Sequence, residues 1–439
     1  MNASTQGPPS PPTEAGLVRG IRRWDLFALM VNSTIGAGIF GLPAKVYALI
    51  GPWSLPAIVA CGAVVALVIL CFAEVASRFE RTGGPYLYAR AAFGSLVGFE
   101  VGWLMWLVRL TSYAALSNLL VAYLPVLWPA AGTPEWRIVV IVGVTAAFAT
   151  INMLGVRNAA LTGNVMTIAK LVPLVLLIVV GLGAVNPGRL ALGPVPESGG
   201  FAKALLLLVF AFTGFELAII PAGESRDPRR DLPWALLSGL GFVAIFYVLI
   251  QIVCVGTVPG LAGSERPLAD AASHVLGPWG GTLIAVGALV SITGTLGAIL
   301  LAAPRLPFAM AEGGGLPSIL ATTHPRFHTP WAAILLTSVL VLALSLSTSF
   351  LGALTIGTII RLVTFILTCV AMLVLRRRRD VPEATLRAPL GGVAATLALL
   401  ACGWLLTSIT RREAGIATLA ALLGLVIYGI GRWAARLRA

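Results

Sequence analysis

The chain has 439 residues, of which 58% are hydrophobic and only 11% charged, and its formal net charge is +13. A soluble protein of this length needs far more charged residues to cover its surface. Apolar runs of about 20 residues recur, a pattern typical of membrane-spanning helices. The five cysteines lie in such runs without a CxxC pair, so no metal site, disulfide framework or cofactor is indicated. The sequence predicts an all-α polytopic membrane protein whose positive charge sets topology and does not bind nucleic acid.

Hydropathy predicts twelve transmembrane spans after a short polar segment. Residues 1–20 are rich in Pro, Ser and Thr and are expected to form a disordered cytoplasmic tail. A core of ten spans is predicted over residues 21–376, and residues 377–439 would hold the last two spans and a cytoplasmic C-terminus. The predicted spans are 24–50, 53–78, 96–124, 137–155, 162–185, 201–222, 232–258, 277–310, 331–348, 350–375, 390–409 and 414–434.

Lys and Arg gather in alternate loops, which orients the chain by the positive-inside rule. The strongest cluster, Arg376–Arg379, follows the tenth span. The opposite loops carry only Arg137, Arg189, Lys203, Arg266, Arg411 and Arg412. This bias predicts a multi-pass protein of the cell membrane with both termini in the cytoplasm. After the second span, residues 86–93 are expected to form a short interfacial helix.

The first span is interrupted where a membrane helix should be most regular. Gly36, Gly38 and Gly41 lie close together and Pro43 follows, and Gly and Pro are the poorest helix formers. Lipid tolerates a broken helix only where its backbone lines an enclosed cavity or binds a ligand. One interpretation is a discontinuous helix whose freed amides bind an anionic group. The other is a close helix–helix contact through small residues.

The sixth span carries a second interruption. Gly214 and Glu216 lie at mid-membrane and Pro221 follows. An ionisable group at that depth is a functional-site hypothesis. Interrupted helices at corresponding positions, here the first and the sixth, are typical of inverted-repeat transporters with a site at the membrane midplane. Spans 1–5 and 6–10 would be the two repeats, with spans 11 and 12 appended.

These interruptions belong to a set of motifs that resembles the amino acid–polyamine–organocation permease family. The motifs are Gly36-Ala37-Gly38-Ile39-Phe40, Phe72–Arg78 leading to Thr82–Tyr86, Phe212–Glu216, Gly223-Glu224 with Asp227-Pro228-Arg229, and the weaker Ala309–Pro317. The resemblance covers spans 1 to 8. It implies a leucine-transporter-type fold, a 5+5 inverted repeat with helices 1 and 6 discontinuous.

The resemblance also implies which groups hold the substrate. The amides of Gly36, Ala37 and Gly38 would bind the α-carboxylate of an amino acid. The carbonyls of Thr34, Phe210 and Thr213 would accept hydrogen bonds from its α-ammonium. The physics agrees, because a helix N-terminus favours an anion and a helix C-terminus favours a cation. By coarse alignment with the family, the side-chain pocket would be lined by Met105, Tyr113, Phe212 and Ile299.

Charged residues within the predicted spans leave alternatives open. By the resemblance, Lys170 would replace the ion of sodium-coupled relatives, bridge the first span to Ser291, Thr293 or Thr295, and exchange a proton during transport. Snorkelling of the lysine to the interface is the alternative. Glu216 is expected either to relay protons or to hydrogen-bond the unwound backbone. Arg109 and Arg361 would read substrate charge or act as buried partners, with the structural role favoured.

Together these features predict a secondary active transporter for amino acids, independent of sodium and either proton-coupled or an exchanger. A polyamine or organic-cation carrier of the same fold is the alternative. It would need several acidic groups in its cavity, whereas only Glu216 lies deep in a span. A membrane enzyme is disfavoured because no nucleophile–base pair or metal cluster falls at membrane depth. The mainly apolar pocket favours neutral substrates, and Arg109 argues against them.

Overall fold

The computed structural model describes residues 22–79, 84–154, 159–219, 228–327 and 329–438, and every regular element within these ranges is a helix. The predicted tail at residues 1–20 lies outside them. So do the motif residues Thr82, Gly83, Gly223, Glu224 and Asp227, together with Pro221.

The helices follow one another along the chain as short and long segments. The α-helices are α1 (Arg23–Thr34), α2 (Ala37–Ile50), α3 (Ser54–Ala76), α4 (Gly84–Phe93), α5 (Ser95–Tyr123), α6 (Pro134–Leu154), α7 (Ala159–Gly183), α8 (Ser198–Ala211), α9 (Phe215–Ile219), α10 (Pro228–Thr257), α11 (Pro267–Leu276), α12 (Pro278–Ala302), α13 (Arg305–Glu312), α14 (Trp331–Ser347), α15 (Phe350–Arg377), α16 (Gly391–Thr407) and α17 (Arg411–Arg438). Short 3₁₀ turns are η1 (Gly51–Trp53), η2 (Leu124–Val126), η3 (Pro129–Gly132), η4 (Pro187–Leu190), η6 (Leu261–Gly263) and η7 (Ser318–Ala321).

Long apolar helices dominate this list. Within the described ranges, 7 helical segments are long and apolar enough to cross a membrane: Gly38–Ala76, Ser95–Val126, Pro134–Leu154, Arg230–Thr257, Pro278–Glu312, Phe350–Arg377 and Arg411–Arg432. Shorter apolar helices cover Lys170–Gly183, Ser198–Ala211, Trp331–Ser347 and Gly391–Thr407. The predicted all-helical, polytopic membrane protein is therefore confirmed, while the number of twelve spans and the inverted repeat stay predictions.

Helix boundaries differ from the prediction on either side of the eighth span. The predicted span 277–310 divides into α12 and α13, because Pro304 lacks the N–H that would continue the helix. Residues 267–276, predicted as a loop, form α11. Gly277, with a φ of 76°, separates α11 from α12. The helix predicted over residues 86–93 is present as α4, and its position at the membrane interface stays a prediction.

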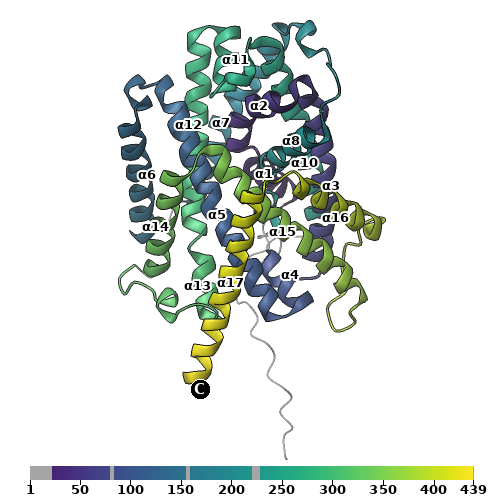
Figure 1. The fold of residues 1–439 in the computed structure, drawn as a ribbon, viewed down its shortest axis with the longest axis vertical. Coiled ribbons are helices and arrows are strands. Elements are labelled where there is room, and N and C mark those ends of the chain that lie inside the picture. Colours follow the sequence, from purple (N-terminus) through teal and green to yellow (C-terminus); the bar gives the residue numbers. More distant parts are fainter. Residues whose placement is uncertain (1–21, 80–83, 155–158, 220–227, 328, 439) are drawn as a thin grey trace, which may run out of the picture.

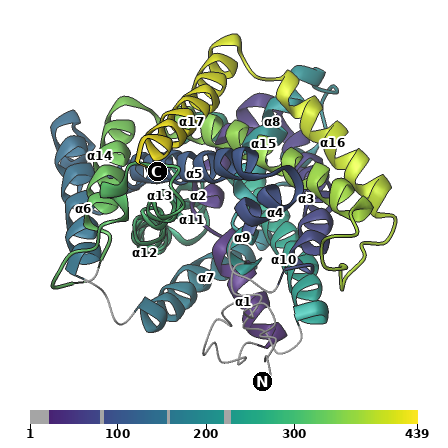
Figure 2. The same cartoon turned by 90° about the horizontal axis from the view of Figure 1, so that it is seen from below.

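The bundle is arranged around α5. This helix packs against α4, α12, α14 and α15, and most of its residues are buried. Figure 1 shows α2 and α11 at one end of the bundle and α4, α13 and the end of α17 at the other. In Figures 1 and 2, α6 and α14 lie side by side at one edge. Near the centre, α1 packs on α10 and α2 packs on α8. The two predicted helix interruptions are thereby brought together.

Candidate functional site

The first interruption separates α1 from α2. Helix α1 ends at Thr34 and α2 begins at Ala37, with Ile35 and Gly36 between them. Gly36 is extended, with φ −116° and ψ −152°, and its amide donates to the Thr34 carbonyl at 2.7 Å. The first amides of a helix have no partner within it and carry the positive end of its dipole. The free amides in this structure therefore begin at Ala37, while the Gly36 amide is engaged by Thr34.

The second interruption separates α8 from α9. Helix α8 ends at Ala211, and Gly214 in the connecting turn has a φ of 117°, a value that residues with a side chain rarely adopt. The amide of Gly214 donates to Glu216 Oε2 at 2.8 Å. The Phe210 carbonyl accepts bonds from the Thr213 amide at 3.2 Å and from Thr213 Oγ1 at 2.6 Å. Glu216 thus hydrogen-bonds the unwound backbone, one of the two roles left open above.

The two interruptions touch each other directly. A Cβ atom at Gly214 would collide with the carbonyl oxygen of Ser33, and one at Gly38 would lie 2.8 Å from Ala211 Cα. Glycine therefore serves close packing at both positions. The buried hydroxyl of Tyr247, on α10, lies 2.9 Å from the carbonyl oxygens of both Thr34 and Ala211. A phenol has one hydrogen to donate, so the two helix ends share it.

Tyr247 is a contact that sequence reasoning missed. It is a single tyrosine in an apolar span, and no motif or period marks it. It contacts both interruptions because α10 packs beside α1, and this depends on the tertiary arrangement.

A cavity of about 410 Å³ opens beside the two interruptions. Its lining includes most of the residues singled out from the sequence: Thr34, Gly36, Gly38, Met105, Arg109, Phe210, Thr213, Glu216, Ile299 and Arg361. It also includes Thr295, which was predicted as a possible partner of Lys170, and residues that were not predicted, among them Ser33, Ser112 and Leu116. Met105, Arg109, Ser112 and Leu116 recur at intervals of three and four and share one face of α5, so this periodicity was the available signal.

Two of the predicted pocket residues lie elsewhere. Tyr113 is buried, and its hydroxyl donates to Thr145 Oγ1 on α6 at 3.1 Å. Phe212 is buried with its ring centroid 5.3 Å from that of Tyr247. Neither belongs to the cavity lining. Their packing partners are helices far away in sequence, so the alignment with the family did not reveal their orientation.

Lys170 lies outside the cavity and contacts the end of α1. Its Nζ donates to the Asn32 carbonyl at 2.6 Å, and the residue is only 5% exposed. The link to the first span thus appears as predicted. Over the described residues, no hydrogen bond joins Lys170 to Ser291, Thr293 or Thr295. Thr295 Oγ1 instead donates to the Ser291 carbonyl of its own helix at 2.8 Å.

Among the described residues, three charged side chains line the cavity: Arg109, Arg361 and Glu216. Arg361 Nε lies 3.7 Å from Glu216 Oε1, so these two form an ion pair. The other oxygen of Glu216 accepts the amide of Gly214. Both carboxylate oxygens therefore have partners within the protein, and Arg361 takes the structural role that was favoured.

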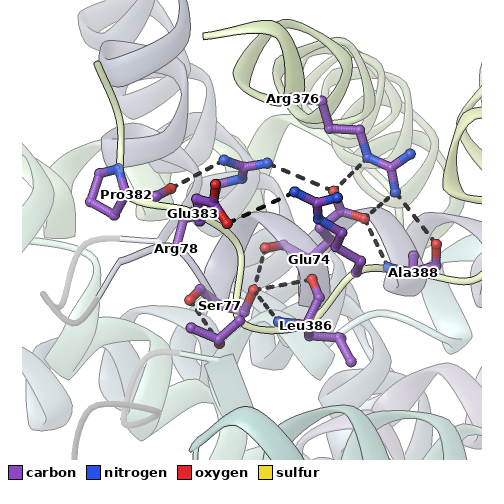
Figure 3. Close-up of polar contacts among 10 residues, drawn as sticks. Glu74, Ser77, Arg78, Arg376, Pro382, Glu383, Leu386 and Ala388 are labelled. Atoms are coloured by element: carbon purple, nitrogen blue, oxygen red, sulfur yellow. Dashed lines mark hydrogen bonds and ion pairs between the residues drawn. The ribbon is translucent and has the colours of Figure 1, made fainter. Parts of the chain in front are cut away.

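A second polar cluster lies at the end of α3, away from the cavity (Figure 3). Glu74 is fully buried and accepts hydrogen bonds from Arg376 at 2.6 and 2.5 Å and from the Ala388 amide at 2.9 Å. Arg78 donates to the Pro382 carbonyl at 3.1 Å. These contacts fasten the segment between α15 and α16 to the end of α3. The acid and base of the Phe72–Arg78 motif therefore hold helices together.

Comparison with known proteins identifies the family of the chain. The family profile described as amino acid permease matches residues 21–429. Among the similar proteins is the serine/threonine exchanger SteT of Bacillus subtilis, 28% identical over 94% of this chain and 97% of the relative. The branched-chain amino acid permease BcaP of the same organism is 28% identical over 94% of this chain and 93% of the relative. The methylthioribose transporter of B. subtilis is 27% identical over 90% of this chain and 89% of the relative.

These relatives are transporters and not enzymes, and the similarity extends over nearly the whole length of each chain. The chain belongs to the amino acid permease family, within the amino acid–polyamine–organocation permeases.

Proposed function

We propose that this protein is a secondary active transporter that moves amino acids across the cell membrane. The observation that carries the proposal is the contact of the two helix interruptions beside a cavity of about 410 Å³. The start of α2 supplies unpaired amides there, and the ends of α1 and α8 supply carbonyls. Opposite helix ends at one point suit a zwitterion, whose two charges have opposite signs.

The α-carboxylate binds at the amides of Gly36, Ala37 and Gly38, and the α-ammonium binds at the carbonyls of Thr34, Phe210 and Thr213. Two of these carbonyls already accept two bonds each: Thr34 from Gly36 and Tyr247, and Phe210 from Thr213. A carbonyl oxygen has two lone pairs, and those of Thr34 and Phe210 are both in use. The ammonium therefore displaces a hydrogen bond at one of these two carbonyls or binds first at the carbonyl of Thr213. Release of the Gly36 amide from Thr34 would also supply the third donor for the carboxylate.

Transport is independent of sodium in this proposal because Lys170 supplies the cation. Its ammonium donates to the Asn32 carbonyl, at the C-terminal end of α1, where a positive charge is favourable. Loss of the proton would free that end of α1, so the cycle is coupled to protons or works by exchange. The core consists of twelve spans with a 5+5 inverted repeat, and both termini lie in the cytoplasm.

A polyamine carrier is the competing proposal, and the charges of the cavity argue against it. In the part of the chain that the structure describes, two arginines and one glutamate line the cavity. A polycation would therefore meet an excess of like charge at low dielectric. The names of the relatives do not select the amino acid, because they include hydroxyl-bearing and branched-chain substrates as well as methylthioribose.

Counter-flow in proteoliposomes tests the proposal. Vesicles with purified protein are loaded with one unlabelled compound and given its labelled form, over a panel of amino acids, putrescine and spermidine. We expect accumulation of at least one amino acid above protein-free vesicles, unchanged when choline replaces sodium. Accumulation of polyamines alone would transfer the assignment to the alternative. Loss of uptake without sodium would refute the role given to Lys170, and no accumulation of any compound would refute the transporter proposal.

A further inference from the structure

One charged side chain of the cavity has no hydrogen bond or salt bridge to any residue that the structure describes. Glu216 Oε1 forms an ion pair with Arg361 Nε at 3.7 Å, and Glu216 Oε2 accepts a hydrogen bond from the Gly214 amide at 2.8 Å. Arg109 also lines the cavity, yet within the described part of the chain it forms no hydrogen bond or ion pair. Among the described residues that line the cavity, two arginines against one glutamate leave one excess positive charge. Glu216 also attracts Arg109 electrostatically, but its salt bridge is with Arg361.

A guanidinium at membrane depth without a hydrogen-bonding or charged partner is costly, because its charge and its five donors need compensation. Two other arginines of the bundle have such partners within the protein. Arg376 has Glu74, and Arg137 donates to Asn118 and to the Ser345 carbonyl, each at 2.9 Å. Arg109 differs from them because it lines the cavity and has no such partner among the described residues.

Arg109 lines the cavity from α5, whereas the two helix breaks belong to other elements. It lies on the face of α5 that carries Met105 and Ser112, whereas the groups proposed for the α-carboxylate and α-ammonium lie at the breaks near Gly36 and Thr213. The backbone at the breaks accounts for both charges of a zwitterion. A further negative group, on the substrate side chain, then meets Arg109 and brings the net charge of the occupied cavity to zero.

We propose that the substrate is an acidic amino acid and that Arg109 binds its side-chain carboxylate. This inference rests on the proposed function and replaces the neutral substrate favoured by the apolar pocket. A guanidinium binds a carboxylate through two parallel hydrogen bonds, which an uncharged amide of the same shape cannot match. A cationic side chain would instead double the excess charge.

The test compares substrates of equal shape and different charge. Counter-flow of the wild-type protein is competed with glutamate against glutamine and with aspartate against asparagine. We expect each acid to compete about ten- to hundredfold more strongly than its amide, the range of a charge-assisted hydrogen bond. In Arg109→Gln this preference should disappear while the affinity for the amide is kept. Arg412→Gln, which removes an exposed arginine at the start of α17, should keep the preference.

The outcomes separate this inference from the function on which it rests. If neutral amino acids are carried and the wild type does not prefer the acids, the inference is overturned and the amino acid carrier stands. If no amino acid is carried, both fall. Should Arg109→Gln fail to fold, the wild-type comparison still decides, and Arg109→Lys, which keeps the charge and loses the planar fork, should retain a reduced preference. An unchanged preference in folded Arg109→Gln would also overturn the inference.

Discussion

Two glycines at the first interruption allow binding and packing to be separated. At Gly36, an added Cβ has no neighbour nearer than the Thr34 carbonyl oxygen at 3.9 Å, and the extended backbone suits any residue. At Gly38, an added Cβ would lie 2.8 Å from Ala211 Cα and 3.1 Å from its Cβ. Both glycines line the cavity. The proposed site therefore predicts opposite effects for Gly36→Val and Gly38→Ala.

Gly36→Val should weaken binding and leave stability unchanged. Its branched side chain projects beside the free amides of α2 and keeps a carboxylate away from them. Loss of one or two charge-assisted hydrogen bonds, about 1.5–3 kcal/mol each, lowers affinity by at least about tenfold. Gly38→Ala should lower stability, because the backbone of Ala211 cannot yield like a flexible side chain. Overpacking of this kind costs about 1–3 kcal/mol.

The assay measures both quantities on the same detergent-purified protein. Thermal unfolding reports stability, and the KM of counter-flow for the best wild-type substrate reports binding. Full affinity in Gly36→Val would refute the assignment of the carboxylate to the start of α2. A melting temperature of Gly38→Ala equal to that of the wild type would refute the close packing of α2 on α8.

Three further changes test other contacts. Tyr247→Phe removes the hydroxyl shared by the two helix ends and should cost about 1–3 kcal/mol, seen as a lower melting temperature; an unchanged value would contradict the shared bond. Glu74→Gln leaves Arg376 without its counter-charge and should lower the free energy of unfolding by up to about 3–5 kcal/mol. The loss should be smaller than this limit because Arg376 is partly exposed. The control Glu383→Gln, at an exposed surface pair, should leave the melting temperature near the wild-type value. Lys170→Ala should abolish the pH dependence of uptake while substrate exchange persists, and a full pH profile in this variant would return Lys170 to a structural role.

The sequence alone determined the class of the protein and the location of its helix breaks. Apolar runs and sparse charge require a membrane environment whatever the packing, because these properties are additive along the chain. The glycines near Gly36 and Gly214 indicate breaks because helix propensity is a local property. The breaks are found at Ile35–Gly36 and between Ala211 and Phe215, within one or two residues of the motifs.

Only the tertiary structure decided which side chains meet. Tyr113 and Phe212 are directed into packing contacts, while Ser112, next to Tyr113, lines the cavity. The sequence does not predict that Tyr247 contacts both breaks. It also does not predict that Glu216 pairs with Arg361 and not with Arg109. Hydropathy in a membrane span leaves the rotation of the helix almost undetermined, since lipid and protein interior are both apolar. That rotation is set by close packing between helices distant in the chain.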